Sequence, residues 1–98
     1  MNYTIFYLKR AIQEYDDAIG WYAEQSERAA LNFQKAVAEK TDMLKSVPSI
    51  YKRTHKAFRE VALNKYPFSV IYTIDSENKM VIISSIFHHS RNPRTKFR

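Results

Sequence analysis

Three features are scarce in this sequence of 98 residues: cysteine is absent, glycine occurs once, and long apolar runs are missing. Without cysteine the chain can form neither a disulfide framework nor a thiolate metal site, which fits a reducing cytosol. A single glycine excludes the glycine-rich loops of P-loop and dinucleotide-binding proteins. No run approaches the ~18 apolar residues of a membrane-spanning helix, and residues 1–8 lack the charged start and long apolar stretch of a signal peptide. We therefore expect a cytoplasmic protein with no membrane partner.

Charge is divided unequally between the two halves of the chain. Residues 1–50 hold six Lys or Arg and seven Asp or Glu, a net charge of −1, whereas residues 51–98 hold ten and three, a net charge of +7. A one-sided basic field on a small protein favours an anionic partner, either nucleic acid or an acidic polypeptide. The alternative is a solvated basic face that has no partner.

The first half of the chain predicts a strand followed by two helices. Residues 3–8 are rich in β-branched and aromatic side chains, which indicates a strand. From Lys9 onward the apolar residues recur at helical steps. They are Ile12, Tyr15, Ile19 and Tyr22. Gly20 in this helix is expected to mark close packing of the second helix.

A second helix is predicted over residues 27–46, and Val47-Pro48 ends it because a residue before proline is pushed out of the helical region. Its apolar stripe consists of Ala30, Phe33, Val37, Thr41 and Leu44. Residues 49–56 follow as a basic connector.

The second half predicts three strands, over residues 58–63, 68–75 and 79–87, with a polar turn between the last two. The whole chain, residues 1–98, is then one α+β domain of order β-α-α-β-β-β. Two N-terminal helices pack on one face of a small, mainly antiparallel sheet, and the other face is expected to be open.

The polar residues of the chain match few catalytic motifs. Three histidines, His55, His88 and His89, show no metal-ligand spacing, and adjacent strand residues point to opposite faces. No strand-to-helix elbow surrounds the serines near them, so a serine hydrolase is not indicated. We expect no bound metal and no cofactor.

Two basic clusters remain as candidates for binding an anion. One cluster lies before and within the predicted strand over residues 58–63, and the other lies at the end of the strand over residues 79–87. In a meander the two clusters could converge on one sheet edge. The cluster members are Lys52, Arg53, Lys56 and Arg59 in the first, and His88, His89, Arg91, Arg94, Lys96 and Arg98 in the second.

Within these clusters the catalytic candidates are His88, His89, Arg59 and Arg91. Such groups suit metal-independent RNA cleavage, in which a 2′-hydroxyl loses a proton, cations stabilise the phosphate and the leaving oxygen gains a proton. The alternative is that one histidine caps the last strand while the other is solvated.

Four aromatic residues on the predicted strands allow two interpretations. They are Tyr66, Phe68, Tyr72 and Phe87. The first interpretation is stacking on RNA bases. The second is packing between the helices and the sheet, which is the better interpretation for a domain of this size. Trp21 and Tyr22 similarly indicate packing or a protein interface rather than a cofactor.

Several segments together resemble the RelE/ParE superfamily of toxins from type II toxin–antitoxin systems. The similar parts are residues 18–25, Phe33, Arg59, residues 66–72 and residues 86–93. The resemblance covers nearly the whole chain in element order, length and basic character.

The resemblance implies a bacterial toxin held inactive by a cognate, usually acidic antitoxin, and a heterotetramer is one assembly that it allows for the two proteins. It also implies one of two targets: DNA gyrase for ParE-like members, or mRNA on the ribosome for RelE-like members, which cleave it with Lys, Arg, His or Tyr side chains. Three positions depart from the pattern of the nucleases: Asn64 and Ser69 stand where Arg is common, and Phe97 is the only aromatic residue near the place of the C-terminal tyrosine. These departures favour a ParE-like or unassigned target. A basic binding module without toxicity is the further alternative.

Overall fold

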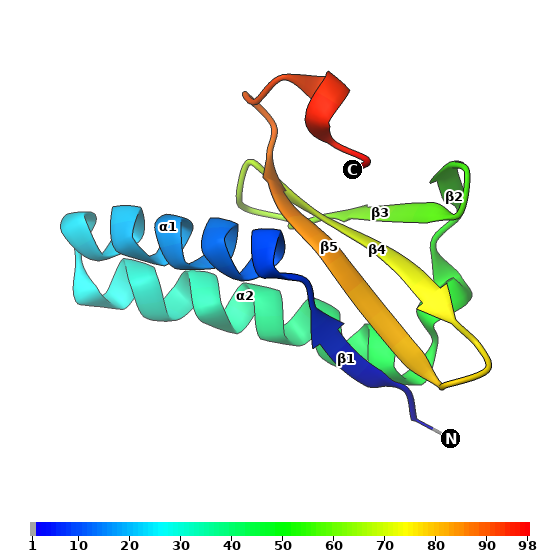
Figure 1. The fold of residues 1–98 in the computed structure, drawn as a ribbon. Coiled ribbons are helices and arrows are strands. Elements are labelled where there is room, and N and C mark those ends of the chain that lie inside the picture. Colours follow the sequence, from blue (N-terminus) through cyan, green and yellow to red (C-terminus); the bar gives the residue numbers. More distant parts are fainter. Residues whose placement is uncertain (1) are drawn as a thin grey trace.

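A helical hairpin and a twisted five-stranded sheet make up the computed structural model, which describes residues 2–98 (Figure 1). In chain order the elements are β1 (Thr4–Tyr7), α1 (Lys9–Gln25), α2 (Glu27–Ser46), the 3₁₀ helix η1 (Pro48–Ile50), β2 (Arg53–His55), β3 (Phe58–Ala62), β4 (Phe68–Asp75), β5 (Met80–His88) and the 3₁₀ helix η2 (Pro93–Thr95). Within the described residues, no helix is both long and apolar enough to cross a membrane.

The strands lie in the order β1-β5-β4-β3-β2. The antiparallel pairing of β3, β4 and β5 confirms the predicted meander and the α+β class. β1 departs from a simple meander, because it lies at the sheet edge parallel to β5, with Thr4 opposite Met80. The predicted connector over residues 49–56 also contains more structure than expected, since it forms η1 and the short edge strand β2.

The buried side of α1 differs from the predicted stripe. Ala11, Glu14 and Ala18 are the buried residues, whereas Ile12 is 48% exposed. Small residues at this spacing let the helix approach the sheet closely. The expectation for Gly20 is wrong, because a Cβ atom built there would meet no heavy atom within 4 Å.

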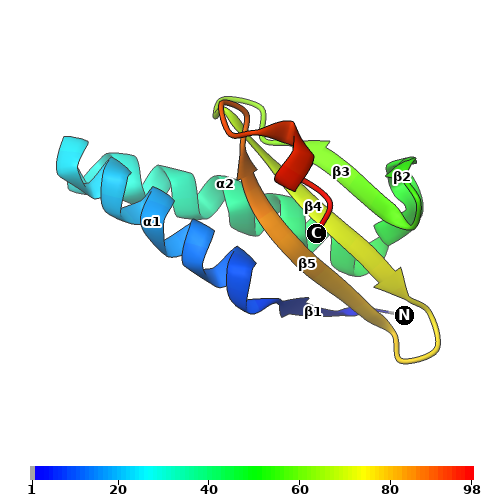
Figure 2. The same ribbon diagram turned by 45° about the horizontal axis from the view of Figure 1, so that its top comes forward.

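The second helix follows its prediction. All five residues of its predicted stripe are buried, and the helix begins where the hydroxyl of Ser26 accepts a hydrogen bond from the backbone N–H of Ala29 at 2.9 Å. An N-cap of this kind satisfies a donor that the first helical turn leaves free. The two helices cover one face of the sheet, which we call the helix-covered face (Figures 1 and 2).

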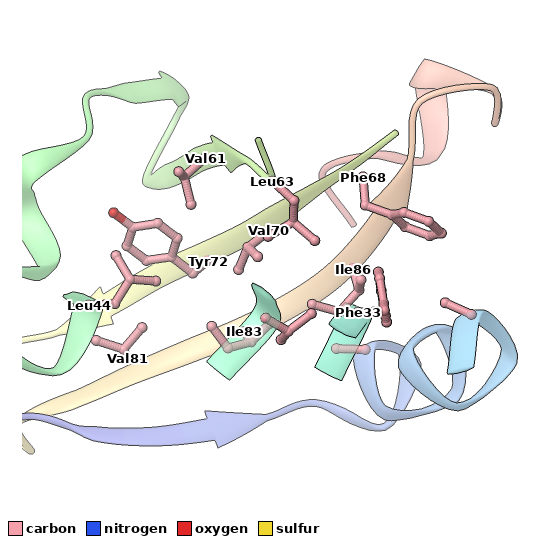
Figure 3. Packing of buried hydrophobic residues seen from close by; sticks show 13 residues of the cluster. Phe33, Leu44, Val61, Leu63, Phe68, Val70, Tyr72, Val81, Ile83 and Ile86 are labelled. Atoms are coloured by element: carbon pink, nitrogen blue, oxygen red, sulfur yellow. The ribbon is translucent and has the colours of Figure 1, made fainter. Parts of the chain in front are cut away.

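Between the helices and the sheet lies the hydrophobic core, in which Phe33 is fully buried (Figure 3). Its ring stacks on Tyr22 with centroids 5.0 Å apart and contacts the rings of Tyr66 and Phe68 at 5.4 and 5.2 Å. Tyr72 is also fully buried. Core packing is therefore the observed role of Phe68 and Tyr72, as the sequence indicates.

A bulge in β5 places one extra residue opposite β4. Ile71 pairs with Ser85 and Tyr72 pairs with Ile83, so Ser84 has no partner of its own. The hydroxyl of Ser84 donates to the carbonyl oxygen of Ile71 at 3.2 Å. The insertion shifts the alternation of side chains along the rest of β5.

The opposite face of the sheet is not fully open, which corrects the expectation. The segment that follows β5 turns back over β4 and β5, and Figure 2 shows η2 in front of these strands. Phe87 and Ile71 are buried, and the ammonium of Lys96 lies 5.5 Å from the ring centroid of Phe87. The C-terminal segment thus covers apolar surface that the sheet alone would expose.

Candidate functional site

The two adjacent histidines at the end of β5 make separate contacts. His88 packs edge-on against Phe68, with ring centroids 4.8 Å apart, and so lies on the helix-covered side. Its Nδ1 accepts a hydrogen bond from the backbone N–H of Ser90 at 3.0 Å and lies 2.7 Å from the hydroxyl of Ser90. His88 therefore stabilises the turn after β5, as the strand-capping alternative expects.

His89 lies at the opposite face. Its backbone N–H donates to the carbonyl oxygen of Pro67 at 2.8 Å, and its Nε2 lies 2.8 Å from the hydroxyl oxygen of the buried Ser69. This hydrogen bond fixes the imidazole orientation across two strands, so His89 is more than a solvated residue. Ser69 was not identified from the sequence as a partner of His89. The pairing of β4 with the end of β5, which places Ser69 opposite Phe87, is the feature that could have indicated this contact.

A buried carboxylate, Glu14 of α1, lies beside the end of β5. Its Oε1 accepts hydrogen bonds from the hydroxyl of Ser85 at 2.7 Å and from the backbone N–H of Ile86 at 3.1 Å. Its Oε2 lies 3.3 Å from both Arg10 Nε and Arg91 Nη1. β1 ends before this part of β5, so the carboxylate takes the place of a strand partner there.

The α1 groove is a cavity of about 290 Å³ between α1 and the ends of β4 and β5. Six of the residues that line it are Trp21, Tyr22, Phe68, Ile86, His88 and Arg91. Trp21 is 58% exposed. A large exposed indole beside a partly apolar cavity is typical of a binding surface for another macromolecule.

On the opposite face, the C-terminal segment meets the β2–β3 hairpin. Lys96 Nζ forms an ion pair with Glu60 at 3.0 Å. The ring of Phe97 stacks on His55, with centroids 4.9 Å apart, and contacts Phe58 at 5.5 Å. The segments that carry the two predicted basic clusters therefore touch through Phe97 and His55, although neither residue is a member of a cluster.

Arg59 lies on the helix-covered side of β3, next to η1. Its Nη1 donates to the carbonyl oxygens of Tyr51 at 2.6 Å and Ser49 at 3.5 Å. Burial raises the pKa of the nearby Tyr72 to about 12, and the positive charge of Arg59 acts in the opposite direction. The hydroxyl of Tyr72 donates to the carbonyl oxygen of Pro48 at 2.6 Å.

The four candidate catalytic residues are not brought to one point. His88 and Arg91 line the α1 groove, whereas Arg59 lines a different groove beside η1. His89 instead contacts Ser69. The expected convergence of the two clusters on a single sheet edge is therefore wrong for these four residues.

The remaining basic candidates are mostly at the surface. Their side chains are exposed, apart from Lys96; the exposed ones are Lys52, Arg53, Lys56, Arg94 and Arg98. Among residues 2–98, no group of three or more His, Asp or Glu side chains is placed to hold a metal ion.

Comparison with solved structures shows the same fold in toxins of known systems. A chain of the "Chromosomal ParDE TA system from P. aeruginosa" is 19% identical, covers 88% of this chain and 95% of its own length, and has a TM-score of 0.74. The isolated E. coli RelE toxin is 15% identical over 96% of this chain and 92% of its own, with a TM-score of 0.59. A chain of the archaeal RelE–RelB complex from Pyrococcus horikoshii OT3 is 15% identical over 94% of this chain and 100% of its own, with a TM-score of 0.60.

A search of curated protein sequences finds no significant match. The family model described as "ParE toxin of type II toxin-antitoxin system, parDE" matches residues 5–93. Since this match spans nearly all of the 98 residues, the chain belongs to the ParE toxin family of type II toxin–antitoxin systems.

Proposed function

We propose that this chain is a growth-inhibiting toxin that acts by binding DNA gyrase and is neutralised by an acidic antitoxin protein. The observation that carries the choice of target is the separation of the candidate catalytic residues described above. Metal-independent RNA cleavage needs a base, an acid and a cation around one phosphate, within hydrogen-bond reach. Arg91 is paired with Glu14, and Arg59 is bonded to backbone carbonyls in another groove.

An antitoxin partner is supported by the family and by the solved relatives, which include a ParDE system and a RelE–RelB complex. We place the antitoxin in the α1 groove. The exposed Trp21 there offers an anchoring surface, and the half-exposed guanidinium of Arg91, although paired with Glu14 through Nη1, presents its remaining donors at the rim. An amphipathic segment with acidic neighbours would complement both features.

The groove assignment is tested with Trp21→Ala and the matched control Leu31→Ala, because both side chains are 58% exposed and lie on different helices. We expect Trp21→Ala to weaken antitoxin binding by about tenfold or more, as for a central aromatic residue of an interface. Leu31→Ala should leave the dissociation constant within about twofold. Equal effects in calorimetric titrations would place the interface elsewhere.

The target is tested by expression and by two reconstituted assays. Expression of the chain alone should arrest bacterial growth, and co-expression of an acidic protein from the neighbouring reading frame should restore it. Purified toxin should stabilise cleaved DNA in the presence of gyrase and leave mRNA on translating ribosomes intact. Normal growth despite soluble expression would favour a basic binding module without toxicity.

Ribosome-dependent mRNA cleavage is a second candidate, favoured by the contact between His89 and Ser69 on the opposite face. That contact holds an imidazole in one orientation at 2.8 Å, and the Lys96 ammonium lies on the same face. If this candidate holds, His89→Ala should abolish cleavage while His88→Ala, on the other face, should not. Absence of cleavage by the unaltered chain would exclude it.

A further inference from the structure

A second groove, which we call the hairpin groove, lies between η1, the β2–β3 hairpin and the turn that joins β4 to β5. It has a volume of about 510 Å³. Six of its lining residues are Pro48, Ser49, Arg53, Arg59, Ile74 and Ser76. None of its lining residues belongs to the α1 groove, so the two surfaces can be tested separately.

Two arginines face each other across this hairpin. Arg53 of β2 is directly opposite Arg59 of β3, and residues in that relation project from the same face of the strands. Like charges directly opposite each other destabilise a sheet. An anion held between them would reverse the sign of this contribution.

The groove contains no anion of its own among the residues that the structure describes, since neither Asp nor Glu lines it. Asp75, which lies between the lining residues Ile74 and Ser76, is engaged elsewhere. Its carboxylate accepts hydrogen bonds from the backbone N–H of Asn78 at 3.1 Å and from the Asn78 side chain at 2.8 Å. The positive charge in the groove is therefore not neutralised by a lining carboxylate.

The guanidinium of Arg59 is held in place by backbone carbonyl groups. The 2.6 Å hydrogen bond from its Nη1 to the carbonyl oxygen of Tyr51 fixes the guanidinium without neutralising it. Ser49 and Ser76 also line the groove, and the Lys79 ammonium lies 5.2 Å from the ring centroid of Tyr3, another lining residue.

We propose that the hairpin groove binds a phosphate group of a nucleic-acid backbone, between the guanidinium groups of Arg53 and Arg59. A guanidinium donates two parallel hydrogen bonds to phosphate oxygens. Two guanidinium groups and neighbouring hydroxyls offer more donors than the two oxygens of a carboxylate require, which favours phosphate. Lys52 and Lys56 on the same hairpin supply charge for adjacent phosphates.

The test uses the purified full chain, inorganic phosphate and a fluorescently labelled single-stranded oligonucleotide. Arg53→Gln removes one guanidinium from an exposed position, and Arg53→Lys keeps the charge but not the paired donors. Arg28→Gln on α2 is the matched control, since it makes the same change of charge at an exposed position outside the groove. Thermal unfolding of each variant verifies that the fold is retained.

Inorganic phosphate should shift the NMR signals of the Arg53 and Arg59 side chains in the unaltered chain. Arg53→Gln should weaken oligonucleotide binding about tenfold, and should reduce the slope of log affinity against log salt by ~0.7. Arg53→Lys should keep the salt slope with a smaller loss of affinity, and Arg28→Gln should change neither quantity appreciably.

Two results would overturn the proposal. Equal losses in Arg53→Gln and Arg28→Gln would mean that nucleic acid responds only to net charge. An acidic peptide that shifts the same arginine signals at lower concentration than the oligonucleotide would identify the groove as a site for polypeptide carboxylates. Neither result depends on the gyrase or growth assays, so failure of the proposed function would leave this test intact.

Discussion

Glu14 and Arg91, which are 77 positions apart in the sequence, form an ion pair with 3.3 Å between Oε2 and Nη1. The pair connects α1 to the segment after β5. Because the carboxylate is almost wholly buried while the guanidinium is about half exposed, the two partners are not equivalent. Removing the Glu14 carboxylate leaves its buried donors without an acceptor. Removing the Arg91 guanidinium leaves the carboxylate with three other donors, which are Arg10, the hydroxyl of Ser85 and the N–H of Ile86.

We expect Glu14→Ala to lower the free energy of unfolding by about 3 kcal/mol, because breaking a buried charge network leaves its remaining members unpaired. Arg91→Ala should cost less, about 1 kcal/mol. Urea unfolding of both variants measures the difference, with the exposed Glu24→Ala as control. Equal costs for Glu14→Ala and Glu24→Ala would contradict the role of the buried carboxylate.

Stability should fall in alkaline solution partly because of Tyr72. Burial raises its pKa from 10.0 to about 12, so the unfolded chain ionises before the folded one. The contribution is fully present below pH 10 and is lost as the pH rises toward 12, an effect of about 2–3 kcal/mol. Tyr72→Phe should show a shallower loss over this window in urea unfolding, and also a small loss at neutral pH from the missing hydrogen bond to Pro48. Parallel pH profiles for the two proteins would rule out this contribution.

Lys56 in the β2–β3 turn has a φ angle of 52°, in the left-handed region. A side chain with a Cβ atom is disfavoured there, and glycine is not. Lys56→Gly should therefore be more stable than Lys56→Ala by about 1 kcal/mol, although both variants lose the same charge. Thermal unfolding of the pair makes the comparison, and a more stable alanine variant would show that the turn carries no such strain.

The contact of Phe97 with His55 and Phe58 should hold the C-terminal segment on the sheet. Phe97→Ala should accelerate hydrogen exchange at the backbone N–H groups of Thr95 and Lys96 by about tenfold, since aromatic contacts contribute roughly 1 kcal/mol beyond burial. Phe6→Ala serves as control, because Phe6 is a half-exposed aromatic residue on β1. Unchanged exchange in Phe97→Ala would mean that the segment is held by other contacts.

Much of the fold could be predicted because its signals are local. The helical stripe of α2, the proline after it and the alternating runs of β4 and β5 each lie within one element. The position of β1 could not be predicted in the same way, since nothing in residues 4–7 indicates that the partner is β5 or that the pairing is parallel. Ile12 was misplaced for a related reason: the small residues Ala11 and Ala18, rather than the larger apolar ones, face the sheet.

The candidate site was less predictable because it depends on which face of the sheet each residue occupies. The alternation of adjacent strand residues did predict that His88 and His89 would separate. The bulge at Ser84 could not be foreseen from composition, and the acidic Glu14 looked like a surface residue of a helix. Its carboxylate accepts a hydrogen bond from the N–H of Ile86, which has no partner in β1 because the pairing of β1 ends at Ile83, and the sequence does not show where that pairing ends.

The parallel pairing of β1 with β5 also sets the order in which this protein can assemble. β1 has its sheet partner in β5, with Thr4 opposite Met80, so β1 completes its pairing only after the distant β5 has been synthesised. A chain interrupted before β5 would lack the strand that holds β1 and the backbone group that contacts Glu14. Contacts between residues so distant in sequence slow folding, and an incomplete copy of this toxin therefore has no route to the finished sheet.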